Sequence, residues 1–352
     1  MTVYLIMLAI SLFFASCAGR LRGMQEYRRN FRVCAVLSFL PFFIVSAIRF
    51  EVGTDWSIYD RYFYAINEGT DQFKERIFNL LNKAVYVFSS DSQLFFAVTA
   101  ALSLIFVFLA IYKHSVYIPF SILLFFVSTI YFNSLNQMRQ GLAMGIFLFA
   151  FRYIEKRDWK KYFLWILIGA GIHLSALLFL PLYFIYGWKA ELKKHLILFG
   201  AILVFMPVLK VVLIKVVSLT PYAWYFESLF KQNDFLLAGF LISFLILVLH
   251  EYYNNVSDSE EDTSYSFMVN MQWLSTVVLL CTGFIPQVSR ISSAFEVIAL
   301  LSVPKMVLRE KNRNRRIVVY CIVTLLFVVR LIYYVYICGF FHVIPYKTFF
   351  SR

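Results

Sequence analysis

The chain has 352 residues, of which 61% are hydrophobic and 15% charged. A soluble globular protein carries roughly 45–50% apolar and about 25% charged residues, so this composition excludes a soluble domain and indicates an integral membrane protein. The net charge of +13 does not predict nucleic-acid binding, because the basic residues cluster in short segments between apolar runs, as in multi-pass membrane proteins. Five cysteines stand singly, with neither metal-ligand spacing nor a disulfide pattern.

Apolar runs long enough to cross a bilayer, which needs roughly 20 residues per helix, predict an all-α, polytopic integral membrane protein. The first run, 2–19, is followed by five arginines within 20–32, which places that loop in the cytoplasm and the N-terminus outside. This run lacks a cleavage site and is interpreted as a retained span. The second run, 33–48, returns to the outer face.

Residues 49–92 then form a long outer segment. Its middle part has the three-to-four spacing of an amphipathic helix, which we expect to lie in the membrane interface. The apolar side chains with this spacing are Phe73, Ile77, Leu80, Leu81, Ala84, Val85 and Phe88.

One later run is ambiguous, because residues 162–187 have basic flanks on both sides. If both flanks are cytoplasmic, the run is a hairpin of two short helices that turns at 169–173. A single long span is the alternative, but it would put the two basic clusters on opposite faces, so we expect the hairpin. Further spans are predicted at about 94–112, 117–132, 142–154, 196–214, 235–249 and 268–285. The last two predicted spans are the apolar run that ends at Arg309 and the run 317–337.

The complete topology has about 12 transmembrane helices, some short or broken, with both termini extracytoplasmic. No linker or repeat divides the chain, so residues 1–352 are expected to form one polytopic domain, with the amphipathic segment at 49–92 on its outer side. This topology places a set of polar side chains at the outer ends of the spans: Arg49, Asp55, Asn133, Asn136, Gln137, Arg139, Gln140, His173, Ser175, Gln287 and Arg290.

The stretch 133–141 is the least ordinary member of this set, because it interrupts two apolar runs. Non-helical backbone at membrane depth is tolerated only where it lines a cavity or is buried in protein; a simple outer turn is the alternative. Amide side chains suit hydroxyl-rich ligands, and arginine suits phosphate, which its planar fork binds through two oxygens. Three arginines from distant segments, Arg49, Arg139 and Arg290, together predict a cationic outer cavity for a polyanionic headgroup that carries sugars.

Each of these residues also has an ordinary structural interpretation. Arg49 and Arg290 are candidates for snorkelling from helix ends, and His173 for a satisfied residue at a helix turn. Asp55 stands in an N-cap position before 56–59. No carboxylate or histidine cluster has the spacing of a metal site. Arg330 and Glu296 lie deeper in apolar runs, where ionisable groups are functional candidates by default.

Two segments carry a family resemblance. Arg49-x-x-Val52-Gly53-Thr54-Asp55-Trp56-x-x-Tyr59 resembles the R-x-x-V-G-T-D-Y-x-x-Y segment of EpsG-family, Wzy-like polysaccharide polymerases, with Trp56 where the family usually has Tyr. Gln137-x-Arg139-Gln140-x-Leu142-Ala143 resembles the family's Q-x-R-Q-x-L-A segment. Three weaker matches follow in the same order, so that the resemblance spans nearly the whole chain: His173-x-Ser175-Ala176, Arg290-Ile291 and Pro345-Tyr346.

The resemblance implies a glycosyltransferase of the bacterial inner (cytoplasmic) membrane, whose active site faces the periplasm or exterior. It would polymerise oligosaccharide repeat units carried on undecaprenyl diphosphate, for O-antigen, capsule or exopolysaccharide, by transferring the growing chain onto a new lipid-linked unit. The expected partners are the lipid-linked donor and acceptor, the bilayer, and a chain-length regulator and flippase of the same pathway. No cofactor, metal or nucleic acid is expected.

Residue roles follow from this expectation. Arg49, Arg139 and Arg290 are the candidates for binding diphosphate, and Arg290 also for stabilising the leaving group. His173 and Asp55 are the competing general bases, and the other role open to Asp55 is to orient His173 or an arginine. Sugar hydroxyls and sugar faces would be held by Asn136, Gln137, Gln140, Tyr59 and Ser175, and the aromatic loop at 222–226 would stack on sugars or line the lipid entrance.

Two other classes stay open. A flippase or transporter of lipid-linked oligosaccharides would also need a cationic cavity, but with polar groups in both halves of the membrane. A non-catalytic membrane scaffold is the third class, and the interrupted spans at 133–141 argue against it.

Overall fold

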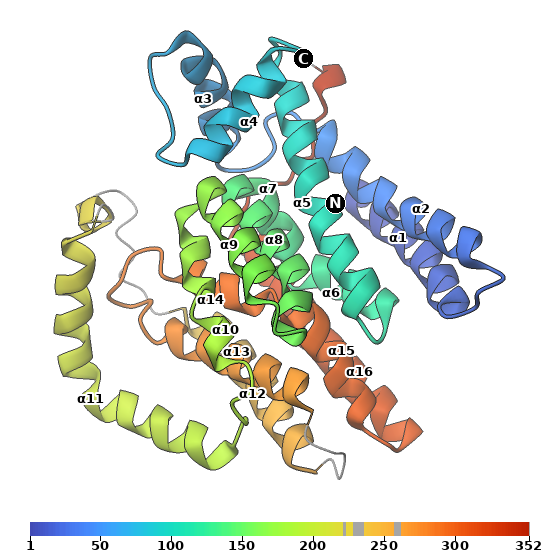
Figure 1. Ribbon diagram of the computed structural model, residues 1–352, viewed down its shortest axis with the longest axis vertical. Coiled ribbons are helices and arrows are strands. Elements are labelled where there is room, and N and C mark those ends of the chain that lie inside the picture. The colour runs from blue at the N-terminus through green and yellow to red at the C-terminus, as the bar shows by residue number, and fades with distance from the viewer. Residues whose placement is uncertain (221–222, 228–235, 257–261, 352) are drawn as a thin grey trace. The chain divides into compact units, whose positions relative to one another are not determined.

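The computed structural model describes residues 1–220, 223–227, 236–256 and 262–351 (Figure 1). The described residues form helices joined by short loops, and the β-contact among them is an isolated bridge between Arg49 and Thr348. The chain divides into two compact units. The first unit comprises 1–184 and 327–352, and the second comprises 185–326.

The first unit contains most of the predicted site residues. Its helices are α1 (Thr2–Leu21), α2 (Arg28–Ala47), α3 (Trp56–Glu68), α4 (Arg76–Tyr86), α5 (Ser92–His114), α6 (Ile118–Val127), α7 (Ile130–Asn136), α8 (Met138–Glu155), α9 (Trp159–Ile172), the 3-10 helix η1 (Leu174–Phe179) and α10 (Leu182–Ile185), with the π-helix η3 (Ile332–Ile337) and the 3-10 helix η4 (Phe349–Ser351) near the C-terminus.

The second unit begins near the end of α10 and ends inside α16. Its helices are α11 (Leu192–Ser218), the 3-10 helix η2 (Ala223–Phe226), α12 (Leu237–Val256), α13 (Thr263–Leu279), α14 (Ser289–Glu296), α15 (Ala299–Arg309) and most of α16 (Arg313–Leu331).

The predicted membrane character is confirmed, since six described helices are long and apolar enough to cross a bilayer: α1, α2, α5, α11, α12 and the α16–η3 segment. Two bent pairs, α6–α7 and α14–α15, each with a 53° bend, raise the number of candidate spans to eight. The remaining four predicted spans correspond to α8, α9, the segment 174–185 and α13. These are shorter or more charged, as in α8, which carries two arginines and a glutamate. The number twelve and the orientation stay predictions.

The predicted reversal of the chain at 169–173 is present. α9 ends at Ile172, and after His173 the chain continues in η1 and α10. Tyr162, near the start of α9, donates a hydrogen bond to Phe179 O at 2.6 Å. Tyr183 and Arg157 exchange two hydrogen bonds of 2.8 Å, each from a side chain to the partner's carbonyl oxygen. The returning arm therefore lies beside the start of α9, as a hairpin requires.

The interruption predicted at 133–141 is confined to one residue. α7 continues to Asn136, α8 starts at Met138, and only Gln137 between them leaves the helical conformation. A separate bend of 53° falls earlier, between α6 and α7 at Ser128 and Thr129, where Thr129 has a φ of 68°. The amides are therefore carried by helix ends rather than by an open loop. A Cβ added to Gly141 would lie 2.8 Å from Ser134 Cβ, so this glycine allows α8 to pack closely on α7.

The segment 49–92 contains two helices, α3 and α4, and α4 lies in the middle part that was predicted to form an amphipathic helix. The expected apolar stripe is buried only in part, because Phe73 and Val85 are buried whereas Leu80 is 63% exposed. The buried face consists of Phe78, Asn79, Asn82 and Val85. Asn79 explains this choice, since its Nδ2 donates to Phe73 O at 2.6 Å and closes the loop that enters α4.

One aromatic core joins α3, α4, α5, α8 and α9, and it holds the helix ends that carry polar groups. Trp56 of α3 stacks on Phe96 of α5 with ring centroids 5.3 Å apart. Met138 of α8 and Ile172 of α9 belong to the same cluster of buried side chains. Burying aromatic side chains supplies much of the packing energy in such a cluster, so the ends of α8 and α9 are fixed relative to α3 and α4.

The helices of the first unit bring several predicted site residues to one end of the unit. The start of α5 lies beside Arg49, because Gln93 Nε2 donates to Arg49 O at 3.2 Å. α5 and α8 run parallel, because their C-terminal ends are linked by His114 Nδ1 and Glu155 Oε2, 3.1 Å apart. The start of α8 and the end of α9 therefore lie at the Arg49 end.

Candidate active site

The polar centre at this end is Glu75, a residue that the sequence analysis did not single out. Glu75 Oε2 lies 2.7 Å from Arg139 Nη1, and Glu75 Oε1 lies 3.3 Å from His173 Nδ1. The backbone N–H of Leu174 also donates to Oε1, at 3.4 Å. One carboxylate thus joins two residues that were predicted from the sequence to share a site.

All three side chains come from helix ends. Glu75 directly precedes α4, Arg139 is the second residue of α8, and His173 directly follows α9. Gly171 makes the approach of α9 to α4 possible, because a Cβ at this position would lie 2.4 Å from Ile77 Cδ1. A real Cβ essentially never comes so close to another atom, so glycine is required for Glu75 and His173 to meet.

The cluster is sheltered, but it is not closed to solvent. The side chain of Glu75 is 10% exposed, that of His173 18%, and that of Arg139 22%. Burial alone would raise the pKa of the Glu75 carboxyl, but the hydrogen bond with His173 and the positive charge of Arg139 outweigh it and lower the pKa to about 2. Glu75 is therefore an anion at neutral pH.

The charge on Glu75 fixes the tautomer of His173. An ionised carboxylate can only accept hydrogen bonds, so Nδ1 of His173 carries the proton that faces it. In the neutral imidazole, Nε2 is then the acceptor. This is the arrangement in which a histidine removes a proton from a hydroxyl while a carboxylate orients the ring and stabilises the imidazolium.

Besides Glu75, the residues Phe73 and Tyr59 hold Arg139 in place. Its guanidinium carbon lies 4.0 Å from the centroid of the Phe73 ring, and its backbone N–H donates to the Tyr59 hydroxyl at 3.5 Å. Tyr59 is only 5% exposed and packs against Phe73 and Phe78. The predicted role of Tyr59 in stacking on a sugar therefore has no open ring face in this conformation, and its hydroxyl positions the start of α8 instead.

Arg49 forms a second centre beside the first. It is 2% exposed, so the alternative in which it snorkels to the surface is wrong. Its Nη1 donates to Val52 O at 2.7 Å, and its guanidinium carbon lies 5.3 Å from the centroid of the Phe96 ring. Burial lowers the pKa of Arg49 to about 10, which leaves the side chain cationic at neutral pH.

The loop after Arg49 is held between the C-terminal tail and α7. Gly53 N donates to His342 O at 3.1 Å, and Thr54 N donates to Asn136 Oδ1 at 2.5 Å. Gly53 has a φ of 109°, and a Cβ there would lie 2.9 Å from Asn136 Oδ1 and 3.1 Å from Arg49 Nη1. Only glycine fits this conformation and this space, which explains the glycine of the Val-Gly-Thr-Asp sequence. Asn136 is thereby occupied by the backbone in this conformation.

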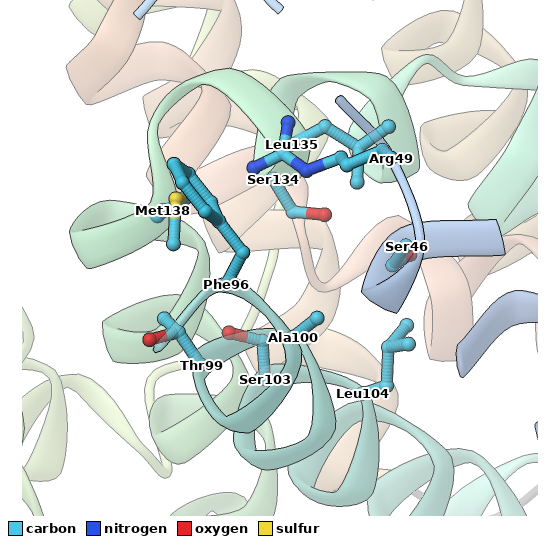
Figure 2. A pocket seen from close by; sticks show the side chains of 10 residues that line it. All are labelled: Ser46, Arg49, Phe96, Thr99, Ala100, Ser103, Leu104, Ser134, Leu135 and Met138. Atoms are coloured by element: carbon cyan, nitrogen blue, oxygen red, sulfur yellow. The ribbon is translucent and has the colours of Figure 1, made fainter. Parts of the chain in front are cut away.

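A small cavity lies next to Arg49 (Figure 2). It is lined by Arg49 and Ser46, by α5 residues such as Phe96 and Thr99, and by Met138 of α8. Its volume is about 10 Å³ for the centre of a water-sized sphere, close to the minimum for one water molecule. It cannot hold a sugar or a diphosphate in this conformation.

The other predicted residues of the first unit lie close to these two centres. Asp55 occupies the N-cap position of α3, as one alternative expected, but its side chain makes no capping hydrogen bond. Gln137 separates α7 from α8, and Gln140 is buried in the first turn of α8. Ser175 is half-buried in η1, two residues after His173.

Arg290 belongs to the second unit, where it is the second residue of α14 and its backbone N–H donates to Gln287 O at 3.0 Å. The structure places Arg290 within that unit, so its convergence with Arg49 and Arg139 stays a prediction. In the aromatic loop at 222–226, Tyr222 lies outside the described residues, whereas the rings of Trp224 and Tyr225 stack with centroids 4.1 Å apart.

Glu75 was missed for a physical reason. It stands between Lys74 and Arg76 in a segment rich in exposed charges, where a lone glutamate is usually a solvated surface residue. Its position just before an amphipathic helix is the available signal, since carboxylates are favoured at helix N-termini. That signal gives no indication of the two partners, which are 64 and 98 residues away.

The fold and the site define a multi-pass helical membrane protein with an Arg–Glu–His cluster held between helix ends. The model of the EpsG family matches residues 32–348, which is most of the chain, so the chain belongs to the EpsG family. This family indicates a membrane protein of the polysaccharide-polymerase type. No curated protein and no solved structure matches the chain.

Proposed function

We propose that this protein is a membrane glycosyltransferase that polymerises undecaprenyl-diphosphate-linked oligosaccharide repeat units at the extracytoplasmic face of the bacterial inner membrane. The growing chain moves from its lipid carrier onto a new lipid-linked unit. The observation that carries this proposal is the contact of one largely sheltered carboxylate, Glu75, with both Arg139 and His173. Membership of the EpsG family supports the reaction class.

The proposed reaction exchanges one glycosidic bond for another and needs one proton acceptor. A hydroxyl oxygen of the acceptor sugar forms a bond to the anomeric carbon of the donor chain. The bond between that carbon and the diphosphate oxygen breaks, and the lipid diphosphate leaves with the electron pair. The hydroxyl proton goes to Nε2 of His173, and Glu75 stabilises the imidazolium that forms.

Negative charge grows on the leaving diphosphate, and fixed cations stabilise it in the transition state. Arg139 suits this role because its side chain is partly exposed and fixed by Glu75 and Phe73. Arg290 is the proposed second cation. Arg49 is covered in this conformation, so a direct contact with phosphate requires the loop 52–54 to open. In the closed loop, Arg49 instead organises the backbone beside Asn136.

This geometry also suggests how the two candidate bases divide their tasks. Glu75 takes the position of the residue that orients His173, a role for which Asp55 was one candidate. We therefore propose His173 as the base and assign Asp55 to the start of α3. Asn136, Gln137, Gln140 and Ser175 surround the two centres and are the proposed contacts for sugar hydroxyls.

The test uses purified full-length protein in vesicles with lipid-diphosphate-linked repeat units and no nucleotide. Longer lipid-linked chains are expected from the wild type, and His173→Ala should reduce their rate of formation by about 10²–10⁴-fold, the usual contribution of a general base. Transfer of substrate across the bilayer without elongation would instead support a flippase. The absence of both elongation and transfer would support a non-catalytic scaffold.

A further inference from the structure

A groove of about 320 Å³ lies at the opposite end of the first unit from Arg49. One wall is the end of α1, with Ser16, Gly19 and Arg20, together with Arg22 just after it. The other wall is the segment 116–119, which links α5 to α6. The volume is within the range of roughly 300–1,000 Å³ that ligand sites occupy.

The two arginines of the groove differ in how they are held. Arg22 donates to two carbonyl oxygens at the end of α5, to Lys113 O at 3.0 Å and to Ser115 O. These carbonyls carry the partial negative charge of a helix C-terminus, so the guanidinium is fixed in place. Arg20 is exposed at the groove. The groove therefore combines one fixed cation with one adaptable cation.

The groove lies where the membrane meets water. α1 begins next to the C-terminal tail, since the Tyr4 hydroxyl donates to Val343 O at 3.1 Å, and its 20 residues span roughly 30 Å. This length matches the hydrocarbon core of a bilayer. α1 and α5 are both candidate spans, and their ends on this side form the groove. A ligand in it would lie at headgroup depth.

The composition of the walls limits the kind of ligand. Val116 and Tyr117 are 48% and 43% exposed, and Ile118 and Pro119 follow them. A free phosphate ion makes no favourable contact with such an apolar surface, whereas a phospholipid has both a phosphate group and acyl chains. Basic pockets between membrane helices are a recurring way to bind anionic headgroups.

We propose that this groove binds an anionic phospholipid, with Arg20 and Arg22 on its phosphate and the 116–119 segment against its glycerol and upper acyl chains. Five arginines between 20 and 32 add attraction to an anionic membrane surface. The site is separate from the candidate active site and does not depend on the proposed reaction.

Two pairs of variants test the site. Arg20→Ala removes the adaptable cation, and Arg29→Ala removes the same charge from the same loop at a residue outside the groove lining. Gly19→Leu fills the groove, whereas Gly19→Ala is the tolerated control, because a Cβ there would lie 3.7 Å from Pro119 Cδ, an ordinary contact.

The measurement is native mass spectrometry of the full-length protein in detergent with added phosphatidylglycerol or phosphatidylcholine, with a parallel thermal-melting assay. The wild type and the controls should retain phosphatidylglycerol in preference to phosphatidylcholine. Arg20→Ala should weaken this preference by about fivefold, since one arginine near an anionic surface contributes on the order of that factor, and Gly19→Leu should abolish it. Melting without added lipid shows whether Gly19→Leu has folded; if it has not, Arg20→Ala decides alone.

Two results would overturn the proposal. One is equal retention of phosphatidylglycerol by the wild type and Arg20→Ala, with Arg29→Ala no different. The other is a rise in melting temperature with inorganic phosphate alone that Arg20→Ala removes, which would make the groove a site for a soluble anion.

Discussion

Glu75 Oε2 and Arg139 Nη1 lie 2.7 Å apart, although 64 residues separate them in the chain. This contact ties the loop before α4 to the first turn of α8. Through its other oxygen, Glu75 also reaches His173 after α9. Three helix ends that carry polar groups are thus held by one carboxylate, and changes that remove or displace this carboxylate give the sharpest tests.

Glu75→Gln should slow chain elongation about 10–100-fold. The amide keeps the size of the side chain but loses the charge that stabilises the His173 imidazolium and holds Arg139. The measurement is the initial rate of elongation with saturating lipid-linked substrate. Glu68→Gln, at the exposed end of α3, is the matched control and should leave the rate unchanged. A wild-type rate in Glu75→Gln would remove this residue from the mechanism.

The assignment of the base predicts unequal effects at the two candidate positions. His173→Ala should cost about 10²–10⁴-fold in the elongation rate, the range of general-base catalysis, whereas Asp55→Ala should cost less than about tenfold, because Asp55 begins α3. Single-turnover rates of both variants decide the question. If Asp55→Ala were the more damaging change at equal folding, the roles proposed here would be reversed.

Gly171→Ala should reduce elongation without touching a polar group. The added Cβ would lie 2.4 Å from Ile77 Cδ1 and 3.2 Å from Ile77 Cβ, so α4 and α9 must separate and His173 must move away from Glu75. The second change Ile77→Ala removes the two closest atoms, Cδ1 and Cγ1, and should restore most of the rate. Rates of the single and double variants are compared; no recovery in the double variant would show that Gly171 acts in another way.

Gly53→Ala and Gly69→Ala make a matched pair for the loop beside Arg49. Both glycines have positive φ angles, 109° and 75°, but a Cβ at Gly69 meets no atom within 4 Å. Each change costs about 1–3 kcal/mol of backbone strain, and only Gly53→Ala also crowds Asn136 and Arg49. We expect thermal unfolding to show the larger loss for Gly53→Ala, together with loss of elongation. Equal behaviour of the two variants would mean that the contact with Asn136 is unimportant.

The pKa of Glu75 predicts a pH dependence of stability. Its folded-state pKa of about 2 lies below its ordinary value of 4.5, so the ionised carboxylate stabilises the fold fully above about pH 4.5. This contribution is lost as the pH falls from about 4.5 towards 2, and after allowance for solvent screening it is about 1–2 kcal/mol. Melting temperatures between pH 6 and 3 should fall less steeply for Glu75→Gln than for the wild type. If the melting temperatures of the two proteins fell in parallel with pH, the lowered pKa of Glu75 would be contradicted.

Much of the fold follows from the sequence, because long apolar runs can satisfy their backbone in a bilayer only as helices. The turn at His173 was also predictable, since basic residues flank the run on both sides. The position of the bend in α6–α7 was not. Thr129 adopts a φ of 68° there, although nothing in its local sequence requires a left-handed residue. The polar stretch at 133–141 contains a break, as predicted, but the break is limited to Gln137.

The site was predictable only in part. Arg139 and His173 stood out because polar residues are rare and costly in apolar runs. Glu75 did not stand out, because an acid in a charged outer segment is ordinary until its partners are known. The burial of Arg49 could not be predicted either, because it depends on the C-terminal tail, which contacts Arg49 through the bridge at Thr348. Local patterns carry no information on such distant contacts.

The most direct test of the central claim is a single-turnover elongation assay with purified protein, lipid-diphosphate-linked repeat units, a metal chelator and no nucleotide. We expect products longer by whole repeat units from the wild type, at least about 100-fold slower formation by His173→Ala and unchanged formation by Glu68→Gln. Elongation by His173→Ala at the wild-type rate, or no elongation by any form of the protein, would contradict this claim.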